Sequence, residues 1–274
     1  HTSYGALLAL YIPVIIGYLF NPGFRWNLKF LAFNVLLIFI VGIILSYTRA
    51  AWVSLIAALG VYLLIQFRVK LWMLVSAGVL VLAVLFTFQE DILIKLEKNR
   101  QDSSGDLAEH VESISNVASD ASNLERINRW NCALRMFEER PVFGWGPGTY
   151  KFQYAPFQSS QELTIISTNF GDLGNAHSEY LGPLAEMGVL GLLTFLAIII
   201  LFYVKSIQLY YKLQNKELKV LVMSSIAGFT TYVTHGILNN FLDTDKASLP
   251  FWGFMAVIVA IDVYYKNKPA EIEG

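Results

Sequence analysis

The sequence predicts an all-α protein, a polytopic membrane helix bundle of about seven spans with one long, mostly helical extracytoplasmic loop. Composition carries the first part of this prediction, because the 274 residues are 55% hydrophobic and only 15% charged, with a mean hydropathy of +0.50. Soluble domains carry about 25% charged residues. The apolar residues also gather in runs close to the ~20 residues that a helix needs to cross a bilayer. These runs are Tyr4–Phe20, Leu28–Leu45, Ala50–Phe67, Leu71–Phe88, Leu181–Val204, Val220–Phe241 and Leu249–Tyr265.

The seven runs divide the chain into four parts. Spans one to four occupy residues 1–88, the long loop residues 89–180, spans five to seven residues 181–265, and a tail residues 266–274. Turn residues such as Asn21-Pro22-Gly23 separate neighbouring runs. The chain begins at His1 without a basic signal-peptide region, so we expect a fragment that lacks upstream spans.

The distribution of Lys and Arg predicts the orientation, because cytoplasmic loops of membrane proteins carry an excess of both. One set of short loops holds ten of these residues, whereas the alternating set holds only Arg49 and Lys246. The long loop belongs to the Arg49 side and is therefore expected to face outward. The ten residues are Arg25, Lys29, Arg68, Lys70, Lys205, Lys212, Lys216, Lys219, Lys266 and Lys268.

Several functional classes receive no support from the composition. The net charge of −1 gives no sign of nucleic-acid binding, and the single Cys132 permits neither an internal disulfide nor a cysteine metal cluster. The sequence holds no Gly-x-x-x-x-Gly-Lys-Ser/Thr phosphate loop and no His-Glu-x-x-His pair. We therefore expect no metal and no cofactor.

The outer loop has two parts of different character. Residues Gln101–Glu125 are rich in Ser, Asn and acidic residues and hold no Lys or Arg, which is typical of a mobile segment. Residues Leu124–Glu139 predict an amphipathic helix that Pro141 ends, followed by a glycine-rich turn at Gly144–Gly148. The expected apolar face of this helix consists of Ile127, Trp130, Leu134 and Phe137.

His177 is the candidate catalytic residue, because it stands at the start of the span Leu181–Val204 and can take up a proton near neutral pH. The residue alone favours a plain interfacial histidine over a general base. If the segment is helical, His177, Tyr180 and Leu184 share a face, and Tyr180 or Glu179 could orient the imidazole.

Three arginines are candidate ligands for an anionic group. Arg126 and Arg129 lie one turn apart at the start of the amphipathic helix, and arginine grips phosphate with two parallel hydrogen bonds. Spacing alone favours this role no more than pairing with Glu125 or with the acidic segment. Arg49 lies on the side that the positive-inside rule disfavours, which points toward a function rather than toward a snorkelling anchor. His235 lies inside a span, where inter-helix hydrogen bonding is the favoured role.

Four motifs follow one another between about residues 46 and 191: Ser46–Trp52, Arg126 with Trp130 and Ala133-Leu134, Pro141–Gly148, and Ala176–Leu181 with Glu186-Met187-Gly188. In order and spacing they resemble the O-antigen ligase-like superfamily of bacterial membrane glycosyltransferases. This group includes O-antigen ligases, O-antigen polymerases and O-linked protein oligosaccharyltransferases. Each motif is weak alone, but the order and the long loop between them are together specific.

The resemblance implies a GT-C-like enzyme of the bacterial cytoplasmic (inner) membrane whose site faces the periplasm. It implies a lipid-linked glycan donor, normally undecaprenyl pyrophosphate, and a lipid or glycan acceptor. Arg49 and Arg126 would hold the pyrophosphate, with Arg129 and Tyr180 as further substrate-binding candidates, and His177 would activate the acceptor hydroxyl. It also implies metal-independent chemistry, and a single displacement would invert the anomeric centre.

Other functions stay open from the sequence. A polymerase or a protein O-oligosaccharyltransferase of the same superfamily shares the same motifs. A lipid-glycan transporter should show inverted repeats and a charged midplane site, and the sequence shows neither. A non-catalytic membrane scaffold differs from an enzyme in that changing His177 would cost it no activity.

Overall fold

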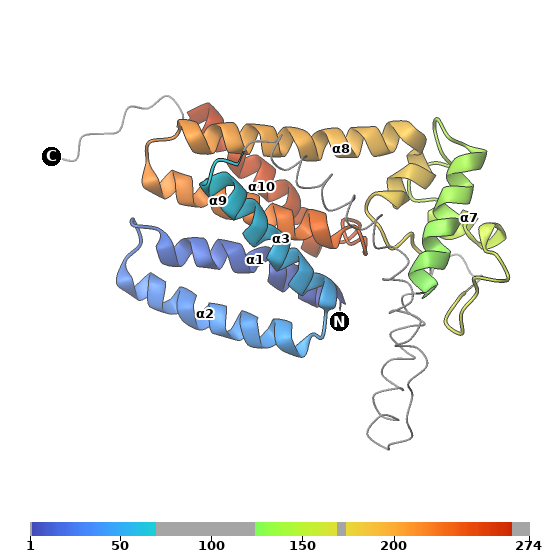
Figure 1. Ribbon diagram of the computed structural model, residues 1–274, viewed down its shortest axis with the longest axis horizontal. Coiled ribbons are helices and arrows are strands. Elements are labelled where there is room, and N and C mark those ends of the chain that lie inside the picture. The colour runs from blue at the N-terminus through green and yellow to red at the C-terminus, as the bar shows by residue number, and fades with distance from the viewer. Residues whose placement is uncertain (1, 70–123, 169–173, 265–274) are drawn as a thin grey trace, which may run out of the picture.

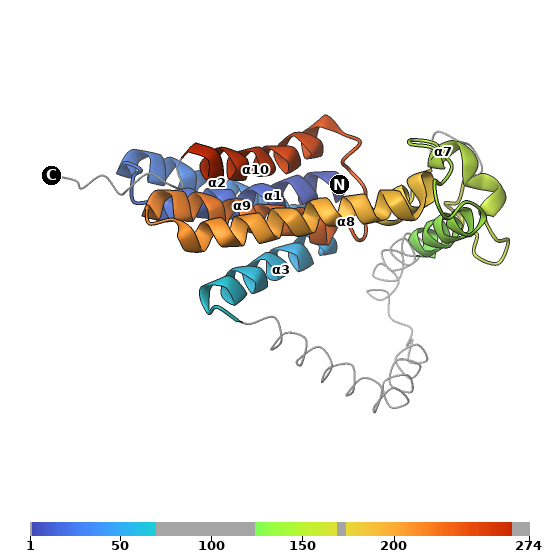
Figure 2. The same ribbon diagram turned by 90° about the horizontal axis from the view of Figure 1, so that it is seen from above.

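The computed structural model describes residues 2–69, 124–168 and 174–264, and these ranges contain helices and loops but no β-strand. In the described part of the chain, the six long helices run side by side and form a bundle, and a smaller helical region lies at one end (Figures 1 and 2). The predicted span Leu71–Phe88 and the acidic segment Gln101–Glu125, apart from its last two residues, lie outside the described residues. The bundle helices are α1 (Thr2–Phe20), α2 (Trp26–Leu45), α3 (Arg49–Gln66), α8 (Leu181–Lys212), α9 (Lys216–His235) and α10 (Asp245–Tyr264).

Five of these helices are long and apolar enough to cross a membrane, namely α1, α2, α3, α8 and α10. The all-helical membrane fold predicted from the sequence is therefore confirmed. α2 is the clearest lipid-facing element, because Ile43 is the one residue of this helix that is buried. α8 is longer than a bilayer requires, and its first turns extend beyond the bundle toward the smaller region (Figure 1).

α9 forms the centre of the bundle and packs against α1, α3, α8 and α10. Its sequence is less apolar than that of its neighbours, because it contains Ser224, Ser225, Thr230 and Thr231. Their hydroxyls donate to backbone carbonyls three or four residues earlier in the same helix, so burial leaves none of these hydroxyl donors unpaired. A helix shielded by other helices does not need a lipid-compatible surface, which explains why α9 is absent from the five membrane-competent helices.

The predicted span Val220–Phe241 was wrong at its C-terminal end, because α9 ends at His235. Residues 236–241 form a turn instead. The backbone N–H of Phe241 in this turn donates to the carboxylate of Glu179, which is incompatible with a continuing helix. This hydrogen bond joins the turn after α9 to the segment that precedes α8.

Among the described residues, the short loops that carry several Lys and Arg lie at one end of the bundle. The α1–α2 and α8–α9 connections and the end of α3 lie there, whereas Thr2, the α2–α3 turn, residues 174–180 and the α9–α10 connection lie at the opposite end (Figure 1). We call this opposite end the site end. The described short loops therefore alternate between the two ends as the sequence predicts, while the predicted span 71–88 and the tail 266–274 lie outside the described residues.

The smaller region at the site end is built around a helix that covers residues 124–139. It also contains α7 (Tyr150–Gln153) and the 3-10 turn η1 (Ala155–Phe157). The predicted helix is confirmed, but its apolar face is not the buried face, because Ile127 and Leu134 are exposed. The buried residues of this helix are Glu125, Asn128, Arg129, Cys132, Ala133 and Met136.

Candidate active site

His177 lies in the loop that joins the smaller region to α8, and both its backbone groups are held. Its N–H donates to Asn175 Oδ1 at 3.0 Å, and its carbonyl accepts from Trp130 Nε1 at 3.3 Å. The residue has φ 47°, in the left-handed region that side-chain-bearing residues rarely occupy. Such a conformation persists only where the surroundings enforce it, and it is common at functional sites.

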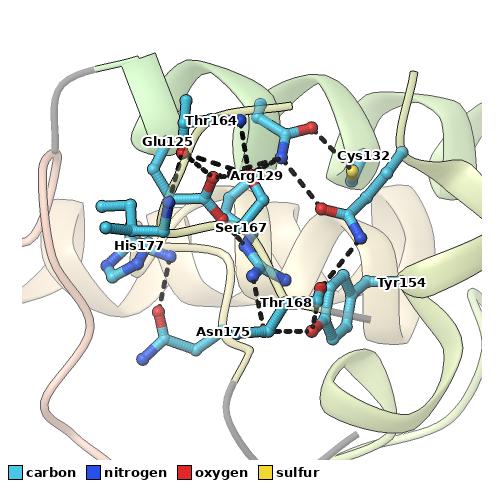
Figure 3. Close-up of polar contacts among 12 residues, drawn as sticks. Glu125, Arg129, Cys132, Tyr154, Thr164, Ser167, Thr168, Asn175 and His177 are labelled. Atoms are coloured by element: carbon cyan, nitrogen blue, oxygen red, sulfur yellow. Dashed lines mark hydrogen bonds and ion pairs between the residues drawn. The ribbon is translucent and has the colours of Figure 1, made fainter. Parts of the chain in front are cut away.

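The helical face predicted for His177 was wrong. Residues 174–180 are not helical, and α8 begins only at Leu181. Two hydrogen bonds, rather than a helix, therefore fix the backbone of His177. Figure 3 shows His177 beside Glu125 and Arg129 of helix 124–139.

The environment of His177 strongly favours its neutral form. Burial lowers the pKa of the imidazole to about 4, and the positive charges of Arg126 and Arg129 act in the same direction against the weaker opposing effect of Glu125. At neutral pH the ring is therefore uncharged and can accept a proton.

Arg129 is held in a buried ion pair. Its Nε donates to Glu125 Oε1 at 2.6 Å, and the two side chains are 3% and 7% exposed. Its Nη2 donates to Thr168 Oγ1 at 3.1 Å, and its guanidinium lies 3.9 Å from the centre of the Tyr154 ring. The pairing with Glu125 that the sequence left open is present, but it is buried rather than solvated.

Glu125 gathers a network of donors that ties two segments together (Figure 3). Its Oε2 accepts from Thr164 at 3.0 Å, from Ser167 and, at 3.4 Å, from Asn128. Burial alone would raise the pKa of this carboxyl, but the hydrogen bond from Ser167 and the charge of Arg129 bring it below its ordinary value. Glu125 is therefore ionised and fastens residues 164–168 to helix 124–139.

Gly174 packs closely against Tyr154 and Arg129 of this network. A Cβ atom at this position would lie 2.3 Å from the Tyr154 ring and 2.6 Å from Arg129 Nη1. Only a residue without a side chain can approach this closely. The glycine lets the chain pass directly over Arg129 three residues before His177.

Arg126 is the arginine that shares a helix face with Trp130, whose indole donates to the His177 carbonyl. Its guanidinium is partly buried, and burial lowers its pKa. Its positive charge also helps to lower the pKa of His177, so Arg126 lies within electrostatic range of that residue. Among the predicted site residues, the structure thus brings Arg126, Arg129 and His177 together.

Arg49 lies at the site end but is placed differently. It is the exposed first residue of α3, and it forms no hydrogen bond or ion pair with the described part of the chain. The neighbouring Ala50 backbone interacts with the ring of His235, whose Nε2 lies 3.2 Å from Asn239 Nδ2. This contact fixes the start of α3 against the end of α9, as expected for a histidine between helices.

Tyr180 points into the bundle. Its hydroxyl donates to the carbonyl of Val233 at 2.8 Å, and its ring meets Phe195 edge to face. The neighbouring Glu179 also points there, because its Oε1 accepts from Tyr232 Oη at 2.5 Å and from the N–H groups of Phe241 and Leu242. Both side chains therefore fasten the His177 loop to α9 and do not orient the imidazole.

The glycine-rich turn and the Glu186-Met187-Gly188 motif form one structure. The carboxylate of Glu186 accepts from the N–H groups of Gly148 and Tyr150, both at 2.9 Å, and its carbonyl accepts from Gly146 at 2.7 Å. Gly188 interrupts α8 with φ 67° and ψ −163°. The N–H groups of the glycine-rich turn therefore bind Glu186 and hold helix 124–139 against α8. We call the turn and residues 186–188 the clasp.

The sequence could reveal the contact between Glu125 and Arg129 but not those of Glu179 and Glu186. Glu125 stands four residues before Arg129, a spacing that places two helical side chains together. Glu179 and Glu186 carry no such local signal, since their partners lie 36 to 63 residues away. In the described ranges, no three His, Cys, Asp or Glu side chains gather as a metal site.

Comparison with known proteins agrees with this architecture. A family model described as O-antigen ligase matches residues 33–196, which is more than half of the chain. The match extends from α2 through helix 124–139 and the His177 loop into α8, and it does not cover the end of α9 or the turn that follows it. A search of curated protein sequences finds no match to this chain. The chain belongs to the O-antigen ligase family.

Proposed function

We propose that this protein is a membrane glycosyltransferase of the O-antigen ligase type. It moves a glycan from an undecaprenyl-pyrophosphate-type donor to an acceptor hydroxyl at the periplasmic face of the bacterial cytoplasmic membrane. One observation carries the proposal: a neutral histidine, His177, lies beside Arg129 (Figure 3) and within electrostatic range of Arg126, where the helix bundle meets the smaller region. A base and a fixed positive charge are the two groups that such a transfer requires.

The reaction exchanges one bond to the anomeric carbon for another. The acceptor oxygen attacks that carbon, the bond to the pyrophosphate oxygen breaks, and its electron pair leaves with the pyrophosphate. His177 takes the proton of the attacking hydroxyl. Attack opposite the leaving group inverts the anomeric centre. Pyrophosphate is a good leaving group once its charge is balanced, so the proposed step uses neither a metal nor a cofactor.

Arg126 is the proposed partner of the leaving pyrophosphate. It lies close enough to influence the pKa of His177 and is partly buried, so its charge is less screened than that of a surface arginine. Donors aimed at developing charge are often worth a few kcal/mol each. Arg129 would add positive charge to the site, and its ion pair with Glu125 would fix the position of its guanidinium.

Arg49 and Tyr180 complete the proposed site from the bundle. Arg49 is exposed at the start of α3 and would bind the pyrophosphate from the bundle. Tyr180 would act on the substrate through the position of the His177 loop, because its hydroxyl is already bound to Val233.

The binding of a donor should also activate His177. Its low pKa in the free protein makes it a weak base. A pyrophosphate between His177 and Arg126 would bring negative charge close to the imidazole and raise its pKa toward neutrality. The base would then strengthen only when a donor is present.

A reconstituted transfer assay tests the proposal. The protein in nanodiscs is given undecaprenyl-pyrophosphate-linked glycan and a lipid-linked sugar acceptor, and the products are separated by mass. We expect the glycan on the acceptor together with free undecaprenyl pyrophosphate. Longer glycans on undecaprenyl pyrophosphate would instead assign a polymerase, and glycosylated protein an oligosaccharyltransferase. Donor that crosses the membrane unchanged would contradict glycosyl transfer.

A further inference from the structure

Helix 124–139 has its two faces arranged in an unusual way. The face that packs against the rest of the smaller region carries the ion pair Glu125–Arg129 together with Asn128 and Cys132. An amphipathic helix of a soluble domain normally buries its apolar face and leaves the polar face in water. The polar groups are buried here because residues 158–168 and Tyr154 satisfy them.

The apolar residues of the same helix form the opposite arc. Ile127 and Leu134 are 47% and 41% exposed, and Trp130 and Phe137 are half-buried. At 100° per residue, these four side chains fall within one narrow stripe that spans three turns. Exposing such an apolar stripe to water is unfavourable. Because the stripe spans three turns, it fits an extended apolar surface better than a single pocket.

The orientation of the helix indicates what that partner is. In Figure 1 the bundle helices run along the long axis of the molecule, and helix 124–139 crosses the site end at a steep angle to α8. The bundle helices cross a bilayer, so helix 124–139 lies nearly parallel to the membrane plane. Its Trp130 donates to His177 O, so part of the stripe faces the site end, where the lipid-facing surface of the bundle stops.

Trp130 in the stripe and Arg126 beside it are residue types that occur at the membrane interface. Trp130 is an amphipathic side chain of the kind that gathers at the level of lipid head groups. Arg126, one turn before Trp130, belongs to the same side of the helix. An apolar stripe with a tryptophan and a flanking arginine is typical of helices that lie on a bilayer.

We propose that helix 124–139 is an interfacial helix whose stripe of Ile127, Trp130, Leu134 and Phe137 rests on the lipid leaflet at the site end. The occupant of this surface is the bilayer itself. Arg126 is then held at the depth of lipid phosphates. This inference does not depend on the reaction, because it concerns only where the helix lies.

Spin-label accessibility tests the proposal on the complete chain in nanodiscs. In a Cys132→Ala background, which removes the one cysteine, labels are placed at Leu134→Cys and, as the matched control, at Glu139→Cys on another side of the same helix. We expect the Leu134 label to be several-fold more accessible to oxygen, relative to a water-soluble nickel chelate, than the Glu139 label. Ile127→Cys gives a second reading if Leu134→Cys does not fold.

Two outcomes would overturn the proposal. Equal nickel accessibility at Leu134 and Glu139 would place the stripe in water. Low accessibility of the Leu134 label to both reagents would place it against protein, either another segment of this chain or a second copy.

Discussion

At the scale of single residues, the site depends on a histidine whose backbone is fixed and whose ring is left uncharged. Asn175 and Trp130 hold the peptide groups of His177, and the two arginines keep its imidazole neutral. The same arginines would attract an anionic substrate. In the proposed reaction, the same two arginines would keep the base neutral and attract the donor.

The pH dependence of the reaction should report the low pKa of His177. A base must be unprotonated, and with a pKa of about 4 the ring is neutral at every pH above that value. We expect kcat/KM to stay constant from pH 8 to about 5 and then to fall as pH approaches 4. The acid limb of kcat should lie at higher pH, because bound pyrophosphate raises the pKa.

Donor binding at pH 4.5 serves as the control that the protein is still folded. An acid limb of kcat/KM near the ordinary imidazole value of about 6.5 would show that the free protein does not lower this pKa.

The two arginines of helix 124–139 should behave differently when they are replaced. Arg129→Met leaves the carboxylate of Glu125 buried without its cation, a loss that typically costs about 3–5 kcal/mol. We expect a clear drop in the thermal unfolding temperature in detergent, and partial recovery in the Glu125→Gln, Arg129→Met double variant. Arg126→Gln should unfold near the parent temperature but bind donor poorly. Equal stability of Arg129→Met and the parent would contradict the importance of the ion pair.

The sequence could single out Arg126 and Arg129 by their spacing of about one helical turn, and His177 by its place at the start of a span and by its family-like motif. It could not resolve what Arg129 binds, since Glu125 and an anionic substrate satisfy the same spacing. It also could not show that Glu179 and Tyr180 turn away from His177. Their partners Tyr232, Phe241 and Val233 become neighbours only when α9 packs beside the His177 loop.

At the scale of elements, the connection between helix 124–139 and α8 depends on glycines. The carbonyl of Pro141 accepts from the N–H of Val189, and Gly188 lets the two segments meet. A Cβ at Gly188 would lie 2.3 Å from the Val142 carbonyl oxygen, and its φ and ψ belong to a region that only glycine enters readily.

Gly188→Ala should therefore destabilise the clasp. The backbone strain alone costs on the order of 1–3 kcal/mol, and the collision with Val142 adds to it. The matched control is Gly60→Ala in the middle of α3, where a Cβ meets nothing within 4 Å. We expect lower thermal stability and weaker donor binding for Gly188→Ala, and parent-like values for Gly60→Ala. Parent-like stability of both variants would show that the interruption of α8 is not needed.

The elements also show where periodicity is informative and where it fails. Apolar runs predicted α1, α2, α3, α8 and α10, because lipid-facing helices must be apolar along their whole length. The apolar stripe of residues 124–139 predicted the helix but not its inward face. Periodicity tells which residues share a side, and it does not tell whether that side meets protein or another apolar medium. The same limit applies to α9, whose end at His235 is set by a tertiary contact of Glu179.

At the scale of the whole molecule, the fold separates its basic loops from its site. Among the short connections that the structure describes, those with most of the Lys and Arg lie at one end of the bundle, and His177 lies at the other. The positive-inside rule then predicts that the site end faces outward. This orientation matches the place where a lipid-linked glycan donor would be used.

Labelling of intact cells tests this orientation. In the Cys132→Ala background, a membrane-impermeant thiol reagent should modify Asp243→Cys in the exposed α9–α10 connection. It should modify Gln214→Cys, between α8 and α9, only after the cells are opened. Labelling of Gln214→Cys but not of Asp243→Cys in intact cells would reverse the topology.

The central claim is that His177 is the base of the transfer reaction, and single-turnover transfer by His177→Ala tests it most directly. Donor binding and glycan transfer are measured on the same nanodisc preparation beside the parent protein. Removal of a general base typically lowers the rate by about 100- to 10,000-fold. We predict parent-like donor binding with transfer reduced within that range. Transfer at the parent rate with equal donor binding would contradict the claim and make His177 a structural residue of its loop.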